Sequence, residues 1–341
     1  MLFSLQPKTD SESYYNYSAQ FSQLKSYLDD SITRLIVVKG LRRAGKTSFS
    51  LTALAKLRKR HIAIDARSLG SNTRSALEKR ILSEFKQTAW LPKRILAMIK
   101  GVEIGGSIAF SSPELGLWDY LKSEETVLFI DEAQELKGTG CDKLLAAIYD
   151  GTRTKLVVSG SEVGLLDEFL GNDDPKAPLF GRGCREIVLE RLHREKSLDF
   201  LERGFQESGV SKSSDELSDA VDQLDGIICW LTLYGFYSLK MEHKAALSKT
   251  LKMGTKLIKE EFSRFLSLRL AARARYDMIM KAVCRGYSSW SEVRNYLSAN
   301  GELVSDPQLA NFLAALQDYG FVTKEDGKYF PADPIVKKNW L

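Results

Sequence analysis

The fold is decided by one stretch, Leu35-Ile36-Val37-Val38-Lys39-Gly40-Leu41-Arg42-Arg43-Ala44-Gly45-Lys46-Thr47-Ser48. Its first residues are aliphatic and β-branched, which favours a buried strand. Residues 40–47 fit the pattern G-x-x-x-x-G-K-[ST], and residues 48–58 contain no Gly or Pro and have a helical composition. The stretch therefore predicts a strand, a phosphate-binding loop and a helix in succession.

The predicted loop has the groups needed to hold a nucleotide with Mg²⁺. Gly40 and Gly45 lack a Cβ, so the backbone N–H groups between them can surround an anion. Lys46 begins the helix and faces the β- and γ-phosphates, while the Thr47 hydroxyl is placed to coordinate Mg²⁺. The alternative is a glycine-rich turn with a chance lysine. We expect ATP or ADP to bind to Gly40, Leu41, Arg42, Arg43, Ala44, Gly45, Lys46, Thr47 and Ser48.

The 341-residue chain is long for one core and suggests two or three domains. Its hydrophobic fraction of 44% and charged fraction of 27% are typical of a globular protein. No apolar run reaches the roughly 18 residues of a membrane span, and the first residues lack the basic start of a secretion signal. The cysteines have no paired spacing, which argues against a zinc site or a disulfide framework. We expect a cytoplasmic protein with no membrane partner.

Positive charge is concentrated in one part of the chain. The net charge is +5, and residues 51–100 carry twelve Lys and Arg against three acids. A basic surface attracts nucleic acid, so the stretch from Lys56 to Lys100 is a candidate DNA-binding surface. A solvated helical face is the alternative.

Four later segments have the composition of buried strands, at residues 61–65, 126–130, 155–159 and 186–189. Together with the intervening helical segments they predict an α/β core, a parallel sheet flanked by helices. The carboxyl ends of parallel strands meet at one edge, so Asp131 and Glu132 should lie beside the phosphate loop. Asp131 would hold Mg²⁺ through water, and Glu132 would polarise the attacking water.

Three further residues are candidates for the same site. Ser159 and Ser161 follow a predicted strand and could sense the γ-phosphate, although a strand-terminating turn explains them almost as well. Arg182 is a candidate for stabilising negative charge during catalysis, with a solvated loop arginine as the alternative.

Four motifs carry a resemblance: residues 40–47, Phe129-Ile130-Asp131-Glu132-Ala133-Gln134, Val158-Ser159-Gly160-Ser161 and Leu179-Phe180-Gly181-Arg182. From about residue 12 onwards the chain resembles the archaeal ATPase family of STAND-type P-loop NTPases, relatives of AAA+ and origin-recognition ATPases. The resemblance implies a P-loop ATPase core (residues 1–190), a helical lid (191–262) and a winged-helix domain (263–341).

The chain departs from the family pattern at two places. Tyr17-Ser18 stands where the family usually has an Arg-Glu pair, and Ile228 stands where its lid usually has a proline beside the base and ribose. Ile228 is freer in φ than proline, so fewer directed contacts reach the base while the phosphate contacts remain. We therefore expect ATP and GTP to bind within about tenfold of each other. Tyr14 and Tyr15 could contact the base or pack in the core.

From residue 271 on, three helical segments precede two short strands around a Glu-Asp-Gly turn, the order of a winged helix. The third helix, residues 306–320, has no Lys or Arg and is a poor candidate for DNA reading. Lys324 and Lys328 in the wing compensate in part. We favour a protein-contact or autoinhibitory role for this domain over direct DNA reading, and the oligomeric state stays open.

The expected function is an ATP-binding, ATP-hydrolysing molecular switch in which Lys46, Thr47, Asp131 and Glu132 carry the chemistry. One alternative is a DNA-binding protein whose conformation is set by bound nucleotide. A second alternative is a protein that binds nucleotide without turnover.

Overall fold

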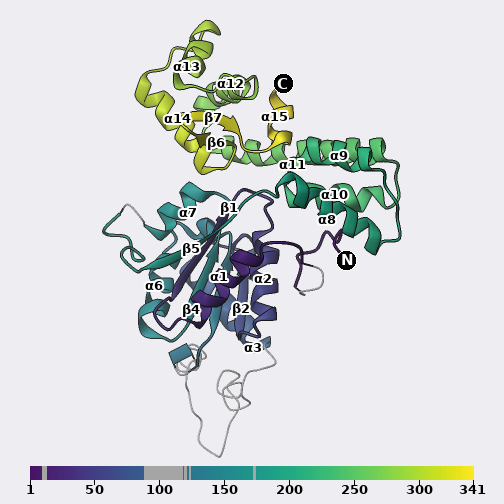
Figure 1. Ribbon diagram of the computed structural model, residues 1–341. Helices are drawn as coiled ribbons and strands as arrows, with labels where there is room; N and C mark the ends of the chain where they lie inside the picture. Colours follow the sequence, from purple (N-terminus) through teal and green to yellow (C-terminus); the bar gives the residue numbers. More distant parts are fainter. Residues whose placement is uncertain (10–13, 88–117, 119–120, 123, 172–173) are drawn as a thin grey trace, which may run out of the picture.

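The computed structural model describes residues 1–9, 14–87, 118, 121–122, 124–171 and 174–341. Figure 1 shows a sheet with flanking helices, a layer of further helices, and a small domain on the far side of that layer. The part of the basic stretch that follows residue 87, including Lys93 and Arg94, lies outside the described residues. Within the described ranges, no helix is long and apolar enough to cross a membrane.

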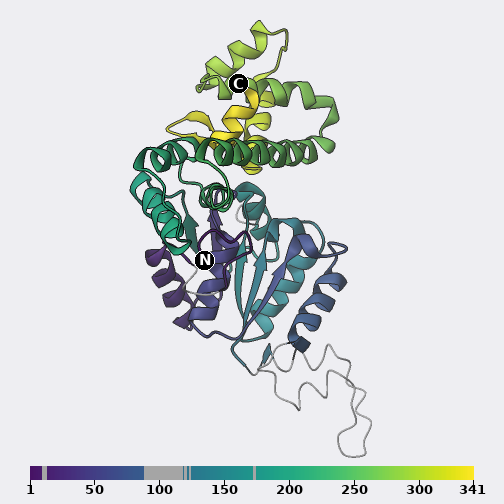
Figure 2. The ribbon, with the colours of Figure 1, turned by 90° about the vertical axis from the view of Figure 1, so that its right-hand side faces the viewer.

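A five-stranded parallel sheet with the order β2-β3-β4-β1-β5 forms the core. The strands are β1 Leu35–Gly40, β2 His61–Asp65, β3 Val127–Asp131, β4 Lys155–Ser159 and β5 Cys184–Leu189. All residues of β1, β3 and β4 are buried, because helices lie on both sides of the sheet (Figure 2). The predicted α/β core is confirmed.

The register of the central strands brings their carboxyl ends to one edge of the sheet. Ile130 of β3 is opposite Val158 of β4, and Val38 of β1 is opposite Ser159. The loop after β1 and the acids at the end of β3 therefore lie on the same side of the core. The flanking elements are α1 Ser18–Asp29, α2 Lys46–Lys56, η1 Ala66–Ser68, α3 Arg74–Gln87, η2 Ala133–Leu136, α6 Cys141–Gly151 and α7 Val163–Leu170.

The middle layer consists of α8 Arg194–Glu207, α9 Ser214–Leu224, α10 Ile228–Ser238 and α11 His243–Ser267. These helices are in the segment that we expected to form a lid. The expected limit between residues 262 and 263 falls inside α11, which continues toward the last domain. Helix α11 therefore contacts both the core and the winged helix.

The last domain is the predicted winged helix. Its elements are η3 Leu270–Ala272, α12 Arg273–Cys284, α13 Trp290–Ala299, α14 Asp306–Asp318, β6 Val322–Glu325, β7 Lys328–Pro331 and α15 Pro334–Trp340. Capping boxes begin α13 and α14, because Ser289 and Ser305 each accept a bond from the third residue of the following helix. Helix α15 was not predicted; the Asp333 side chain caps it and Pro334 fits its first turn.

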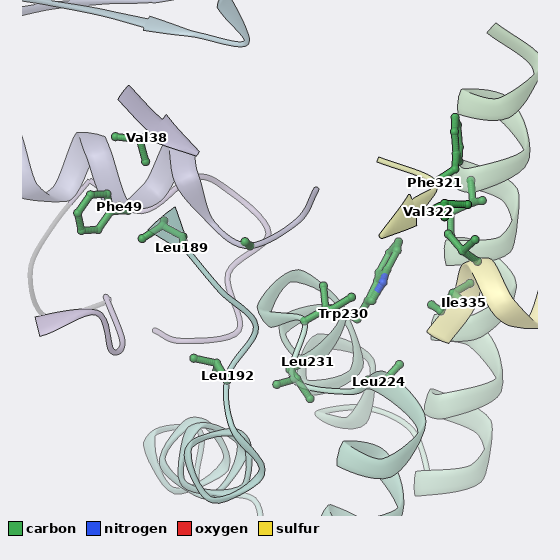
Figure 3. Close-up of a cluster of buried hydrophobic side chains, with 14 of the residues drawn as sticks. Val38, Phe49, Leu189, Leu192, Leu224, Trp230, Leu231, Phe321, Val322 and Ile335 are labelled. Carbon is green, nitrogen blue, oxygen red and sulfur yellow. The ribbon is translucent and has the colours of Figure 1, made fainter. Parts of the chain in front are cut away.

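One apolar cluster runs through all three layers (Figure 3). Val38 and Phe49 contribute from the core, Trp230 and Leu231 from α10, and Phe321 from beside the wing. Trp230 is 2% exposed and lies between the middle layer and the winged helix. The position of the winged helix is therefore held by burial of apolar surface as well as by polar contacts.

Candidate nucleotide site

The loop between β1 and α2 has a backbone that its glycines permit. Gly40 has φ +149°, and a Cβ there would lie 2.2 Å from the Leu189 carbonyl oxygen. Gly45 has φ +87° immediately before α2. The first N–H groups of α2 have no partner within the helix and point toward the loop, as in an anion-binding helix start.

Lys46 is buried at the first position of α2, with 5% exposure. Its Nζ donates to the carbonyls of Gly40 (3.0 Å) and Leu41 (2.8 Å), so the ammonium lies inside the loop. Burial lowers the pKa of Lys46 to about 8, although Glu132 and Asp131 nearby oppose the shift. A phosphate placed in the loop would compete with the two carbonyls for this ammonium.

Thr47 and Asp131 meet as the sequence predicts. The Thr47 hydroxyl donates to Asp131 Oδ2 (2.5 Å), and the Ser159 hydroxyl donates to Oδ1. Burial raises the pKa of Asp131, while these two hydrogen bonds act in the opposite direction. A hydroxyl beside a carboxylate is a hard-oxygen pair that suits Mg²⁺ together with phosphate oxygens and water. Among the described residues, no group of three or more His, Cys, Asp or Glu is placed to hold a metal ion.

Glu132 follows β3 with φ 52°. Its Oε2 accepts bonds from the Ser161 hydroxyl (2.8 Å), the Ser161 N–H (3.1 Å) and the Gln134 amide (2.7 Å). Burial alone would raise the pKa of Glu132, but Lys46 and these hydrogen bonds lower it below its usual value. The carboxylate is therefore charged at neutral pH and can accept a proton.

Arg67 belongs to the same edge and was not identified from the sequence. It lies on η1 after β2, and its guanidinium is 4.0 Å from Asp131 Oδ2 and 3.9 Å from Glu132 Oε1. Asp65 holds it through two side-chain bonds of 2.9 Å. The sequence signal that could have identified Arg67 was its position, two residues after the end of a predicted strand. Arg67 offsets part of the negative charge of the two acids.

A cavity of about 400 Å³ opens from the phosphate loop toward the middle layer. Lys46, Thr47, Ser48, Arg67 and Glu132 line one end of it. The other end is lined mainly by apolar and aromatic groups from several segments, among them Leu5, Pro7, Tyr14, Tyr15, Phe200, Ile228, Trp230 and Leu233. A nucleotide has charged phosphates at one end and a largely apolar base at the other. The charged end and the apolar end of this cavity therefore match the two parts of a nucleotide.

The three N-terminal tyrosines differ in the hydrogen bonds of their hydroxyl groups. Tyr15 donates to Asp199 and to the Lys196 carbonyl, and Tyr17 donates to the Glu190 carbonyl (2.6 Å). The Tyr14 hydroxyl is buried and has no hydrogen-bond partner among the described residues. Burial raises the pKa of Tyr14. Tyr14 therefore lines the cavity and has a buried hydroxyl without a partner among the described residues.

The two arginines of the phosphate loop reach into other layers. Arg42 bonds Glu162 in the core and donates from Nε to the Tyr319 carbonyl at the end of α14 (3.3 Å). Arg43 bonds Glu261 of α11 (2.6 Å) and lies over the Trp230 ring at 4.5 Å. The loop that would hold phosphate thus contacts the middle layer and the winged helix directly.

Arg182 lies elsewhere in this chain, contrary to our expectation. It precedes β5, whose first residue, Cys184, is opposite Leu35 at the start of β1. Arg182 is therefore near the amino edge of the sheet, opposite the phosphate loop. Its guanidinium bonds Asp150, with Nε to Oδ1 at 3.0 Å. The loop after α7 places the side chain beside α6 and not beside the phosphates.

Known protein families and solved structures match this chain. Residues 14–232 match the ATPase domain found predominantly in Archaea, and residues 270–332 match the C-terminal winged helix-turn-helix domain of MCM proteins. A Walker-type ATPase of Pyrococcus abyssi aligns over 100% of this chain and 99% of its own, with 30% identity and a TM-score of 0.83. RuvB of Thermotoga maritima, a Holliday junction branch migration motor, aligns over 96% of each chain with 13% identity and a TM-score of 0.46. No curated protein matches the chain.

The resemblance to archaeal ATPases and the predicted C-terminal winged helix are confirmed by these matches. The closer links to STAND and AAA+ proteins stay predictions. The first match covers more than half of the chain, and the full-length match includes every layer described above. The chain belongs to the family of ATPase domains found predominantly in Archaea.

Proposed function

We propose that the protein binds Mg-ATP at the phosphate loop, hydrolyses it, and uses its nucleotide state to set the position of the lid and the winged helix. The main support for this proposal is a pair of hydrogen bonds from the phosphate loop. Arg42 donates to the Tyr319 carbonyl of the winged helix, and Arg43 donates to Glu261 of α11. In this proposal the core of residues 1–190 holds the chemistry, and residues 191–262 and 263–341 respond to it.

The phosphate end of the cavity has a residue for each step of hydrolysis. Lys46 and the N–H groups at the start of α2 would hold the β- and γ-phosphates. Thr47 and Asp131 would hold Mg²⁺, which neutralises developing charge on the phosphate oxygens. Glu132 would accept a proton from water as the water oxygen bonds the γ-phosphorus and the bond to the β-phosphate oxygen breaks.

The contacts of Lys46 suggest how phosphate binding reaches the other layers. Its ammonium bonds the carbonyls of Gly40 and Leu41, and Leu41 directly precedes Arg42. A bound phosphate would take over the ammonium and release these carbonyls, so the loop would rearrange next to both arginines. Because Arg42 and Arg43 hold Tyr319 and Glu261, a change in the loop would shift the balance of those contacts.

Glu261→Gln tests the coupling without replacing a residue of the phosphate loop. The variant removes the charged partner of Arg43, while Glu260→Gln on the exposed side of the same helix serves as the matched control. Hydrogen exchange of α14 and β6 would be measured without nucleotide, with Mg-ADP and with a non-hydrolysable ATP analogue.

We expect nucleotide to change exchange in the wild type and in Glu260→Gln. The response should be reduced in Glu261→Gln, with α14 already less protected without nucleotide. Identical exchange of α14 in every nucleotide state of the wild type would contradict the switch while leaving ATP binding untouched.

A further inference from the structure

Cations gather on the solvent face of α11. Lys252, Lys256, Lys259 and Arg264 are all exposed, and they line one shallow groove with Thr255, Glu260 and Ser263. Lys252, Lys256 and Lys259 follow each other at spacings of four and three residues, which puts them on one face of a helix. In Figure 2 this long helix crosses the molecule between the core and the winged helix.

The basic groove continues beyond both ends of this set. Toward the start of α11, a second hollow shares Lys252 and adds Lys244 and Lys338. Toward its end, a third hollow shares Lys259 and adds Arg273 and Lys281 of α12, Arg285 directly after that helix, and the acid Asp277. Residues 244 to 264 alone span about 30 Å at the helical rise of 1.5 Å per residue. We call this continuous surface the α11 groove.

Most of this charge is not paired with acids. Among the described residues, no carboxylate lies within 4.0 Å of Lys252, Lys259 or Arg264, and Lys256 is 4.0 Å from Glu260. The close ion pair of the groove is Lys281 with Asp277, at 2.8 Å. The basic stretch identified from the sequence is different. In its described part, Lys59 bonds Asp29 at 2.7 Å, and Arg74 and Arg80 bond acids of their own helix at 2.9 Å. Among the described residues, the α11 groove therefore has more cations without an acid within 4.0 Å than the basic stretch has.

The helix that usually serves as the recognition helix of a winged-helix domain has no positive charge here. Helix α14, Asp306–Asp318, contains no Lys or Arg. Its carboxyl end is also occupied by the core, since Arg42 bonds Tyr319 and Asp318 lies against Gly164 of α7. Helix α14 is therefore a poor surface for a large anion.

We propose that the α11 groove binds the phosphate backbone of a nucleic acid. A linear row of Lys and Arg about 30 Å long fits a linear polyanion and provides contact without base reading. A lipid surface is the main rival, because Leu268 and Leu270 beside the groove are 86% and 69% exposed. Both leucines lie at one end, whereas the cations extend along the whole helix, which favours the polyanion.

The test uses the full-length protein and a fluorescent 24-base-pair duplex, with DNA and RNA versions measured across a salt series. One variant changes Lys252, Lys256, Lys259 and Arg264 to Gln, which keeps helix propensity nearly constant. A matched variant changes Lys56, Lys79, Arg80 and Lys86 to Gln and removes the same charge from the other basic region. Vesicles containing phosphatidylserine form a separate arm, and thermal unfolding verifies that each variant is folded.

We expect the wild type to bind a duplex and the groove variant to bind at least tenfold more weakly at low salt. Loss of four phosphate contacts should make the slope of log affinity against log salt less negative by about 3 to 4. The matched variant should retain most of the binding, and the DNA and RNA versions show which nucleic acid is preferred. Absence of duplex binding, an unchanged slope in the groove variant, binding lost only in the matched variant, or binding to vesicles alone would overturn the proposal. None of these outcomes depends on ATP hydrolysis.

Discussion

The two ends of the nucleotide cavity are built in different ways. The phosphate end takes Lys46 and Thr47 from one loop and Asp131 and Glu132 from the tip of a neighbouring strand. The apolar end takes Tyr14, Ile228 and others from segments that are far apart in the chain. The first set is held by the sheet, and the second is held by the packing of the lid on the core.

This difference separates chemistry from recognition. At the phosphate end, charged groups and hydrogen bonds orient the side chains, as in the bonds from Thr47 and Ser159 to Asp131. At the apolar end, the hydroxyl of Tyr14 has no partner, and the lid residue Ile228 offers no directed contact. Affinity should therefore come mainly from the phosphates, and the base should add little.

The largest effect is expected from Lys46→Ala. Removing the buried ammonium takes away the side-chain cation that faces the phosphates, so ATP affinity should fall by about a hundredfold or more and turnover should be lost. Lys56→Ala at the other end of α2 is the control and should change neither. Calorimetric titration and phosphate release measure both quantities. Unchanged affinity in Lys46→Ala would mean that the loop does not hold phosphate.

Glu132→Gln should separate turnover from binding. The amide cannot accept a proton from water, so turnover should fall by about a hundredfold or more while ATP affinity stays within a few fold. Glu135→Gln on the exposed side of η2 is the matched control. Equal turnover in wild type and Glu132→Gln would remove Glu132 from the reaction.

The pH dependence of binding should follow Lys46. Its pKa of about 8 in the free protein means that it is charged below pH 8 and loses its proton above it. Bound phosphate favours the charged form, so affinity should be lost as pH rises, by about tenfold between pH 7 and pH 9. Titration in buffers of different ionisation enthalpy should show proton uptake at pH 9. A flat affinity without proton uptake would contradict a neutral Lys46.

The smallest effect is expected from Tyr14→Phe. If the free hydroxyl bonds the base or ribose, its loss should weaken ATP about threefold to tenfold, near 1 kcal/mol, without lowering the melting temperature. Tyr17→Phe is the informative control, because its hydroxyl already bonds the Glu190 carbonyl and its loss should cost stability. Unchanged ATP affinity in Tyr14→Phe would leave the apolar end without a polar contact from this residue.

The phosphate end could be predicted from sequence because its geometry follows from local rules. A strand, a loop and a helix fix Lys46 and Thr47, and the common edge of parallel strands brings Asp131 beside them. Arg67 was missed because nothing in the pattern indicates which side chains after β2 turn toward the loop. Arg182 was expected beside the phosphate loop because its own loop has no periodicity from which the direction of the side chain could be inferred.

The contacts between layers could not be predicted. Arg42 and Arg43 match the loop pattern as ordinary variable positions, yet their partners Tyr319 and Glu261 lie more than two hundred residues away. Counting charges along the sequence also favoured residues 51–100 as the nucleic-acid-binding surface. The count does not show that acids such as Glu78 and Glu84 pair with these cations, because the pairing depends on the folded helix. Both features arise from packing between elements distant in the chain, which local composition does not record.

Titration of the wild type with Mg-ATP and Mg-GTP shows whether the phosphates or the base supply most of the binding free energy. If the phosphate end dominates, the two dissociation constants should agree within about tenfold, or about 1.4 kcal/mol. A preference for ATP of about a hundredfold or more, near 2.7 kcal/mol, would contradict the account. It would show that the apolar end reads the base as strongly as the loop holds the phosphates.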